Sequence, residues 1–84
     1  MNPFVKQMIN HKINSITSEQ LYQLGEQYNT PISRNQAKQI AAILHEQTVD
    51  IVDETQRKRI ISRIAREVSP GVAKKIKTLL EVFL

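Results

Sequence analysis

Four times along this chain, an apolar residue stands directly before a residue that favours the N-cap of a helix. Seven positions after each cap lies an aliphatic residue, in phase with the apolar side of a helix. Successive caps are sixteen, twenty and sixteen residues apart, which leaves room for one short helix and its connection each time. This pattern restricts the chain to a small all-α fold. The four junctions are Ile16-Thr17, Ile32-Ser33, Val52-Asp53 and Val68-Ser69.

A side-chain oxygen at the N-cap accepts a hydrogen bond from a backbone N–H that the first helical turn leaves unpaired. Three of the four caps also have Gln three residues later, which is the spacing of a capping box. The fourth cap, Ser69, is followed by Pro70, whose fixed φ suits the first helical position. The three predicted capping boxes are Thr17 with Gln20, Ser33 with Gln36, and Asp53 with Gln56.

Apolar residues follow a helical period between these starts and also before the first one. We therefore predict a single compact all-α domain over residues 1–84, built from about five short capped helices. The connections between the helices are short throughout. The predicted helices lie near residues 3–13, 18–28, 34–47, 54–67 and 70–82.

Each predicted helix has an apolar side, and we expect the apolar sides of the last four helices to be buried. The first helix would place Phe4, Val5, Met8, Ile9 and Ile13 on one side. The second helix would bury Leu21, Leu24, Gly25 and Tyr28, and the third would bury Ala37, Ile40, Ala41, Ile43 and Leu44. The fourth would bury Ile60, Ile61, Ile64, Ala65 and Val68. The fifth would bury Val72, Ala73, Ile76, Leu79, Leu80 and Phe83.

The stretch from Thr48 to Val52 is β-branched at four of its five positions, which favours an extended backbone. An isolated strand would not be stable, so we predict an extended connector. Residues 30–40 align with 50–60 at several positions, and one interpretation is a pair of related helical hairpins after an N-terminal helix. The alternative is that any chain of short capped helices shows such coincidences.

Length and composition limit the class of protein. A chain of 84 residues with 40% hydrophobic and 24% charged residues has the balance of one globular domain. Cysteine is absent, which excludes disulfides, thiolate nucleophiles and the commoner structural zinc sites. Polar residues interrupt the start before a signal-peptide core could form, and no stretch approaches the roughly 20 apolar residues that span a bilayer. We expect a cytoplasmic bacterial protein that does not cross a membrane.

Charge is divided unevenly along the chain. Residues 1–56 have four basic and six acidic side chains, whereas residues 57–84 have eight basic and two acidic ones. Lys and Arg on neighbouring helices could meet phosphates, but they are also typical of a solvated helix face. Aromatic residues are not interleaved with these cations, which argues against stacking on single strands. The candidate face for a nucleic acid or an acidic partner comprises Arg59, Arg63, Arg66, Lys74, Lys75 and Lys77.

Catalytic patterns are not found in the sequence. His11 and His45 have no Ser, Asp or Glu at a spacing that indicates a triad or a ligand set. The acidic residues Asp50, Asp53 and Glu54 lack the glycine and bidentate Glu of a calcium loop, and capping explains Asp53 and Glu54. We therefore expect no enzyme activity, no cofactor, no metal site and no small-molecule substrate.

Large apolar side chains at both ends of the chain suggest a surface for another protein, because chain termini usually lie at the surface. The alternative is that they fold onto the core, since Phe83 continues the apolar side of its helix. We favour a protein-interaction module, with self-association or an unknown protein partner, over nucleic-acid binding. The candidate apolar contacts are Phe4, Val5, Val82, Phe83 and Leu84.

The whole chain, from Met1-Asn2-Pro3 through the Ile-Thr and Pro-Ile-Ser junctions to Ser69-Pro70 and Phe83-Leu84, resembles the YqfT-like family. This is a family of short uncharacterised proteins from low-GC Gram-positive bacteria. The resemblance implies a bacterial cytoplasmic setting. It transfers no activity and no catalytic or binding residue to this chain.

Overall fold

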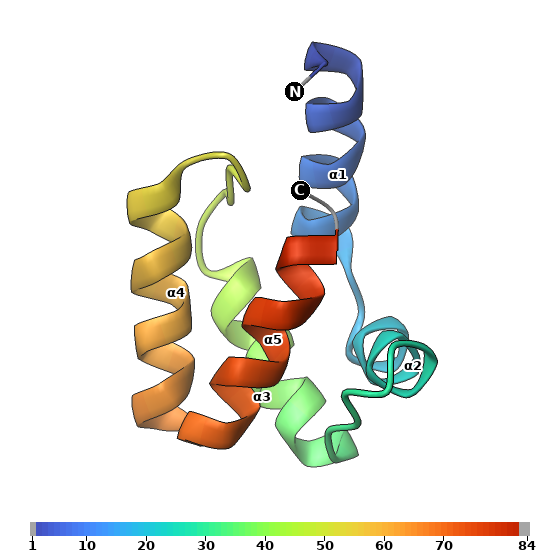
Figure 1. Cartoon of the computed structure of the whole chain (residues 1–84), viewed down its shortest axis with the longest axis vertical. Coiled ribbons are helices and arrows are strands. Elements are labelled where there is room, and N and C mark those ends of the chain that lie inside the picture. The colour runs from blue at the N-terminus through green and yellow to red at the C-terminus, as the bar shows by residue number, and fades with distance from the viewer. Residues whose placement is uncertain (1, 83–84) are drawn as a thin grey trace.

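The computed structural model describes residues 2–82, and these residues form five helices and no strand (Figure 1). The predicted all-α fold is confirmed. Predicted and observed helix bounds differ by at most two residues. The helices are α1 (Pro3–Ser15), α2 (Ser18–Gln27), α3 (Arg34–His45), α4 (Glu54–Glu67) and α5 (Pro70–Val82).

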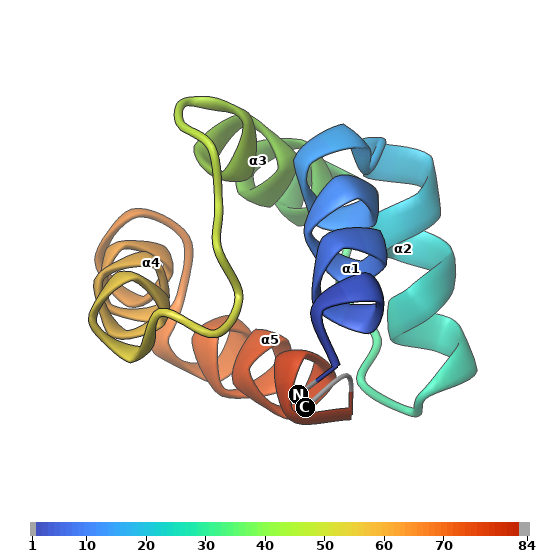
Figure 2. The ribbon, with the colours of Figure 1, turned by 90° about the horizontal axis from the view of Figure 1, so that it is seen from above.

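The helices pack as two pairs around one core. α2 packs against α3 and α4 packs against α5, while α1 and α4 both contact α3, and α2 contacts α5. Seen from above in Figure 2, α4 lies across the molecule from α1 and α2, with α3 and α5 on either side between them. The two predicted helical hairpins after the N-terminal helix therefore correspond to α2 with α3 and α4 with α5.

The centre of the core is formed by three isoleucines from different elements. Ile40 of α3, Ile51 of the connection between α3 and α4, and Ile64 of α4 are each 0% exposed. Burial of such a side chain contributes roughly 1.5–3 kcal/mol relative to leaving it in water. The predicted core residues of α3 are all buried, namely Ala37, Ile40, Ala41, Ile43 and Leu44.

Side-chain caps begin the helices where predicted. The Thr17 hydroxyl accepts a hydrogen bond from the Gln20 N–H at 3.1 Å, and the Gln20 side chain accepts one from the Thr17 N–H at 3.0 Å. Ser33 and Gln36 form the same capping box, with both distances 3.0 Å. The Ser69 hydroxyl accepts from two N–H groups in the first turn of α5 at 3.2 and 3.4 Å. Each cap satisfies backbone donors that the helix itself cannot.

The predicted capping box at Asp53 is only half formed. The Asp53 carboxylate accepts from the Gln56 N–H at 3.0 Å, as expected of an N-cap. The Gln56 side chain does not return to Asp53; it accepts from the Asp50 N–H at 2.6 Å and donates to the Thr48 carbonyl at 3.0 Å. Gln56 therefore connects α4 to the preceding segment instead of closing its own helix start.

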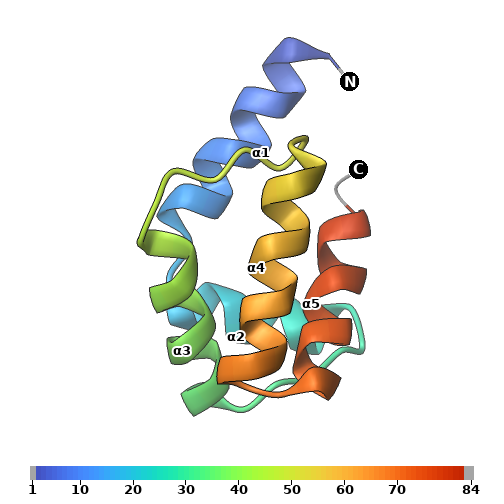
Figure 3. The ribbon, with the colours of Figure 1, turned by 90° about the vertical axis from the view of Figure 1, so that its left-hand side faces the viewer.

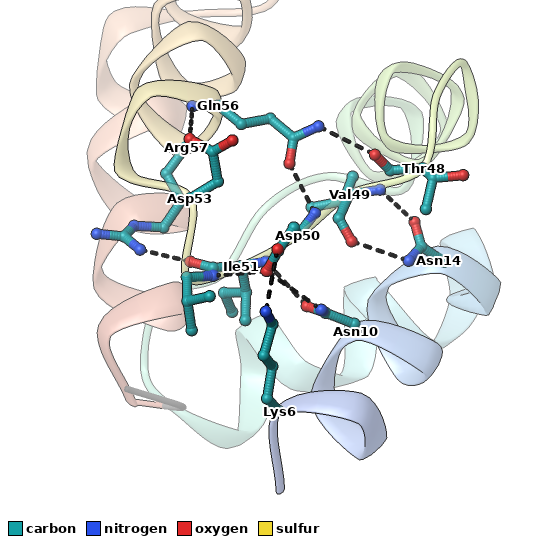
Figure 4. A network of polar contacts seen from close by, with 11 residues as sticks. Lys6, Asn10, Asn14, Thr48, Val49, Asp50, Ile51, Asp53, Gln56 and Arg57 are labelled. Atoms are coloured by element: carbon teal, nitrogen blue, oxygen red, sulfur yellow. Dashed lines mark hydrogen bonds and ion pairs between the residues drawn. The ribbon is translucent and has the colours of Figure 1, made fainter. Parts of the chain in front are cut away.

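The segment between α3 and α4 is neither helix nor strand, and side-chain amides pair with its backbone (Figure 4). The predicted extended connector ends in a turn at residues 51–52, where the Asp53 N–H donates to the Asp50 carbonyl at 3.1 Å. From α1, Asn14 accepts from the Val49 N–H at 2.7 Å and donates to the Val49 carbonyl at 3.0 Å. One turn earlier, Asn10 accepts from the Ile51 N–H at 2.8 Å. These bonds replace those of a neighbouring strand, which is why a segment with buried Val49 and Ile51 is stable without a sheet.

Asp50 adds a charged contact to the same network. Lys6 lies 3.3 Å from its carboxylate, and Asn10 donates to it at 3.3 Å. Partial desolvation opposes ionisation of Asp50, but hydrogen bonds from Asn10, the Val52 N–H and Lys6 outweigh it and lower the pKa of this carboxyl group. The contact ties the middle of α1 to the connection between α3 and α4.

The predicted apolar side of the first helix is buried only at its C-terminal end. Ile13 is buried and Ile9 half-buried, whereas Phe4, Val5 and Met8 are exposed. Figures 1 and 3 show the reason, because the N-terminal half of α1 extends beyond the other helices. Only the end of this apolar side near Ile13 joins the core, while the candidate apolar contacts Phe4 and Val5, together with Met8, remain exposed.

Tyr28 is also exposed, although it was predicted to be buried. It is the C-cap of α2, where the backbone leaves the helix, and the following Asn29 has a φ of 57°. Asn tolerates this left-handed conformation, which is typical of a helix end. The turn at Asn29 ends the helical phase on which the burial of Tyr28 depended.

Within residues 2–82, no helix is both long enough and apolar enough to cross a bilayer.

Candidate interaction surfaces

The first two turns of α1 carry large apolar side chains into solvent. Asn2 is the N-cap, and its side chain accepts from the Phe4 N–H at 2.8 Å, so the helix begins at Pro3, well before it reaches the body of the molecule. Phe4 is 78% exposed and Met8 is 72% exposed. They are four residues apart and lie on the same side of the helix. We call Phe4, Val5 and Met8 the α1 ridge.

A shallow apolar groove continues from this ridge along the side of α1 that faces α2. Its volume is about 170 Å³. Lys12 is the only charged residue in its wall, and Met8 belongs both to the groove and to the ridge. We call it the α1–α2 groove; it is lined by Met8, Ile9, Lys12, Ile13, Ile16 and Leu24.

The C-terminal end of α5 supplies the remaining predicted apolar contact. Val82 is 49% exposed, and α5 ends at the same end of the molecule at which α1 begins (Figures 1 and 3). Phe83 and Leu84, which were predicted to take part in the same surface, lie outside the described residues. Of the predicted apolar contacts, Phe4, Val5 and Val82 therefore lie within the described residues, and all three are exposed.

Arg63 has a different environment from the other predicted basic residues. Its guanidinium forms a two-pronged contact with Glu46 at the end of α3, including a bond of 2.8 Å, and its Nε donates to Glu67 on α4. The hydrogen bond from Arg63 lowers the pKa of Glu46, and the two carboxylates raise the pKa of Arg63. Arg63 thus joins α3 to α4, and its donors are directed at carboxylates of the chain.

Arg59 and Arg66 lie on the outward face of α4 and form no ion pair among residues 2–82. They line a broad, shallow depression of about 710 Å³ in which every lining side chain carries a hydrogen-bond donor. Gln47 and Arg63 complete its wall. We call the exposed residues of this face the donor stripe; they are Thr55, Lys58, Arg59, Ser62 and Arg66.

The three predicted lysines of α5 are not gathered in this depression. The Lys75 ammonium donates to the Pro31 carbonyl at 2.6 Å, between α2 and α3. Lys77 lines a separate groove between α4 and α5, whose wall also contains Glu54 and Glu81. Lys74 is exposed and lines neither hollow. The six predicted basic residues therefore lie in several different environments.

Reasoning from the sequence missed Lys12, Lys58 and Ser62 as residues of these surfaces. Lys12 would have stood out because α1 contains basic residues and no acidic one. Ser62 lies three residues after Arg59 and four after Lys58, which are spacings of neighbours on a helix surface that the sequence already shows.

The two histidines lie on different helices, His11 on α1 and His45 on α3, and both are exposed. The described part of the chain contains no group of three or more His, Cys, Asp or Glu side chains that could hold a metal ion.

Comparison with known proteins places the chain in a family. Residues 1–84 match the family described as "Protein of unknown function (DUF2624)". The chain belongs to this family. It is also 26% identical over 78 residues to the uncharacterised protein YqfT of Bacillus subtilis strain 168, and the match covers 93% of each chain. The resemblance to the YqfT-like family is therefore confirmed, and no solved structure matches this DUF2624 protein.

Proposed function

We propose that this DUF2624 protein is a non-enzymatic protein-interaction module that docks a partner helix on the α1 ridge and the α1–α2 groove. The observation that carries the proposal is the exposure of Phe4, at 78%, and of Met8, at 72%, directly beside an apolar groove. Exposed apolar side chains that adjoin a groove are typical of surfaces that bind another protein. The proposed setting is the cytoplasm, where disulfides are rare, and a chain without cysteine is compatible with it.

The partner that fits this surface is an amphipathic helix with carboxylates beside its apolar side. α1 carries Lys6, His11 and Lys12 and no acidic residue, and the net charge of the chain is +4. Lys6 already contacts Asp50, which leaves Lys12 at the edge of the groove for an acidic residue of the partner. A second copy of the chain would bring another basic α1, so charge favours a different protein.

We propose that the module is non-enzymatic because its candidate catalytic side chains either stabilise the fold or lie apart from one another. Neither histidine has a hydrogen-bonded carboxylate among the described residues, and Asp53 caps α4. Asp50 contacts Lys6 and Asn10. General acid–base chemistry needs a titratable group within hydrogen-bond reach of a reacting atom, together with groups that orient it.

Site-specific photo-crosslinking tests the docking surface. A photoreactive phenylalanine derivative is placed at position 8, within the surface, or at position 38, an exposed site on α3. The variant replaces the protein in a bacterium that carries the gene, and adducts are identified by mass spectrometry after irradiation. We expect an adduct from position 8 only, and its loss when Phe4→Ser is added.

The mapped segment of the captured protein, made as a peptide, then tests the partner's chemistry. We expect Lys12→Glu to weaken peptide binding at least tenfold, and exchange of a peptide Glu for Lys to restore it. Equal adducts from both positions, or none from position 8, would reject the docking surface. An adduct with the mass of two copies of the chain would identify self-association as the interaction.

A further inference from the structure

The donor stripe on α4 is a second surface, separate in position and chemistry from the apolar surface of α1. Thr55, Arg59, Ser62 and Arg66 follow one another at steps of four, three and four residues, so they lie on one side of the helix. All four are exposed, and Lys58 lies beside them in the same depression. At 1.5 Å per residue, the row extends roughly 16 Å along α4.

The two arginines of the stripe differ from Lys58 because they form no ion pair with a carboxylate of the described residues. Lys58 pairs with Glu54 at 3.1 Å, whereas Arg59 and Arg66 have no carboxylate partner in residues 2–82. They are two helical turns apart, roughly 10 Å along the axis. An extended polyanion with regularly spaced charges can place one anionic group against each of them.

Arg63 keeps this face free of unpaired negative charge. Glu46 and Glu67 lie next to the stripe, and both are bound by the Arg63 guanidinium. No carboxylate lines the depression. The neighbouring groove between α4 and α5 differs, because Glu54 and Glu81 lie in its wall and would repel an anion. Among the described residues, the side of α4 whose depression is lined by hydrogen-bond donors and by no carboxylate is the side that suits a polyanion.

We propose that the donor stripe binds the phosphate backbone of double-stranded nucleic acid. Guanidinium groups, ammonium groups and hydroxyls are the side chains that contact phosphates in such complexes. No aromatic side chain lines the depression, so the stripe offers no stacking partner to unpaired bases. Contacts with phosphates are the same for every base sequence, so the proposed binding does not depend on sequence. The inference goes beyond the protein-docking function and uses different residues, so either can fail alone.

A titration with labelled nucleic acid tests the proposal. The full chain is titrated by fluorescence anisotropy into a 20-base-pair DNA duplex and an RNA duplex of the same sequence, at salt concentrations from 50 to 200 mM. The test variant is Arg59→Ala/Arg66→Ala, whose changes are at exposed helix positions and should leave folding intact. The control is Lys38→Ala/Lys74→Ala, which removes the same net charge from exposed positions of α3 and α5 that line none of the hollows described above.

We expect the wild type to bind at 50 mM salt, and the test variant to bind at least tenfold more weakly while its circular dichroism is unchanged. The slope of log K against log salt should fall in magnitude by about 1.8, which corresponds to two lost phosphate contacts. The control should change the affinity less than threefold. A preference for the DNA or the RNA duplex would identify the source of the phosphates, and either one supports the proposal.

Three results would overturn it. The wild type could fail to bind either duplex at 50 mM salt, or the control could lose as much affinity as the test variant, which would reduce the effect to net charge. Polyglutamate could also displace the duplex at an equal concentration of negative charges. The stripe would then be a binding site for an acidic protein and not for nucleic acid.

Discussion

Asn14 on α1 pairs with both backbone groups of Val49, accepting from its N–H at 2.7 Å and donating to its carbonyl at 3.0 Å. The two residues are 35 positions apart, and Val49 is buried in the core. The primary amide of one side chain thus takes the place of a partner strand along this part of the connection. The pairing allows Val49 to lie inside an all-α protein with both of its backbone groups hydrogen-bonded.

Asn14→Ala should lower the free energy of unfolding by about 1–3 kcal/mol, because it leaves the backbone groups of Val49 without their partner. Asn35→Ala is the matched control, since Asn35 is exposed on α3, and it should change the stability by no more than about 0.5 kcal/mol. Urea unfolding followed by circular dichroism measures both. Equal effects of the two substitutions would mean that the pairing does not stabilise the fold.

The helix starts were predictable because their causes are local. Thr17 and Ser33 need only the N–H groups of the next turn and a Gln three residues later, and the sequence shows both. Gln56 has the same spacing from Asp53, yet its side chain contacts Thr48 and Asp50 instead. That choice depends on how the connection between α3 and α4 folds back over the start of α4, which spacing alone does not encode.

The surfaces were less predictable, because exposure depends on which elements are neighbours. Helical periodicity places Phe4, Met8 and Ile13 in one apolar pattern, but only the part of α1 near Ile13 has other helices beside it. In the same way, Arg59 and Arg63 look alike in the sequence. Arg63 contacts Glu46, which is 17 positions away, and only the packing of α3 on α4 shows this.

Ile13→Ala and Phe4→Ala should therefore have different effects. Ile13 is 7% exposed and packs in the core, so its truncation should lower the free energy of unfolding by about 2–5 kcal/mol. Phe4 is 78% exposed, and its truncation should change stability by no more than about 0.5 kcal/mol. Thermal and urea unfolding compare the two. A large loss from Phe4→Ala would show that Phe4 packs on the fold and is not available to a partner.

The two glycines should respond in opposite directions to substitution by alanine. A Cβ atom on Gly25 would lie 2.9 Å from the Thr30 carbonyl oxygen, so Gly25→Ala should push α2 from the following turn and cost about 1–3 kcal/mol. On Gly71 the nearest atom would be the Ser69 hydroxyl at 3.6 Å. Gly71→Ala should be neutral or stabilise α5 by up to about 1 kcal/mol. Unfolding midpoints in urea distinguish these outcomes, and similar midpoints would argue against the close approach at Thr30.

The contact of Glu46 with Arg63 should make stability depend on pH in the acidic range. The hydrogen bond from Arg63 holds the pKa of Glu46 below its usual value, so ionised Glu46 stabilises the folded state. This contribution is fully present above the pKa of the unfolded chain, about 4.3, and disappears as the pH falls through the lower pKa of the folded state. Wild type should therefore be more stable than Glu46→Gln at pH 7, and the difference should vanish towards pH 3.

Glu26→Gln, at an exposed residue without an ion pair in the described part of the chain, is the control. Urea unfolding at several pH values measures the difference, and one that persists unchanged at pH 3 would show that the ion pair is not its source.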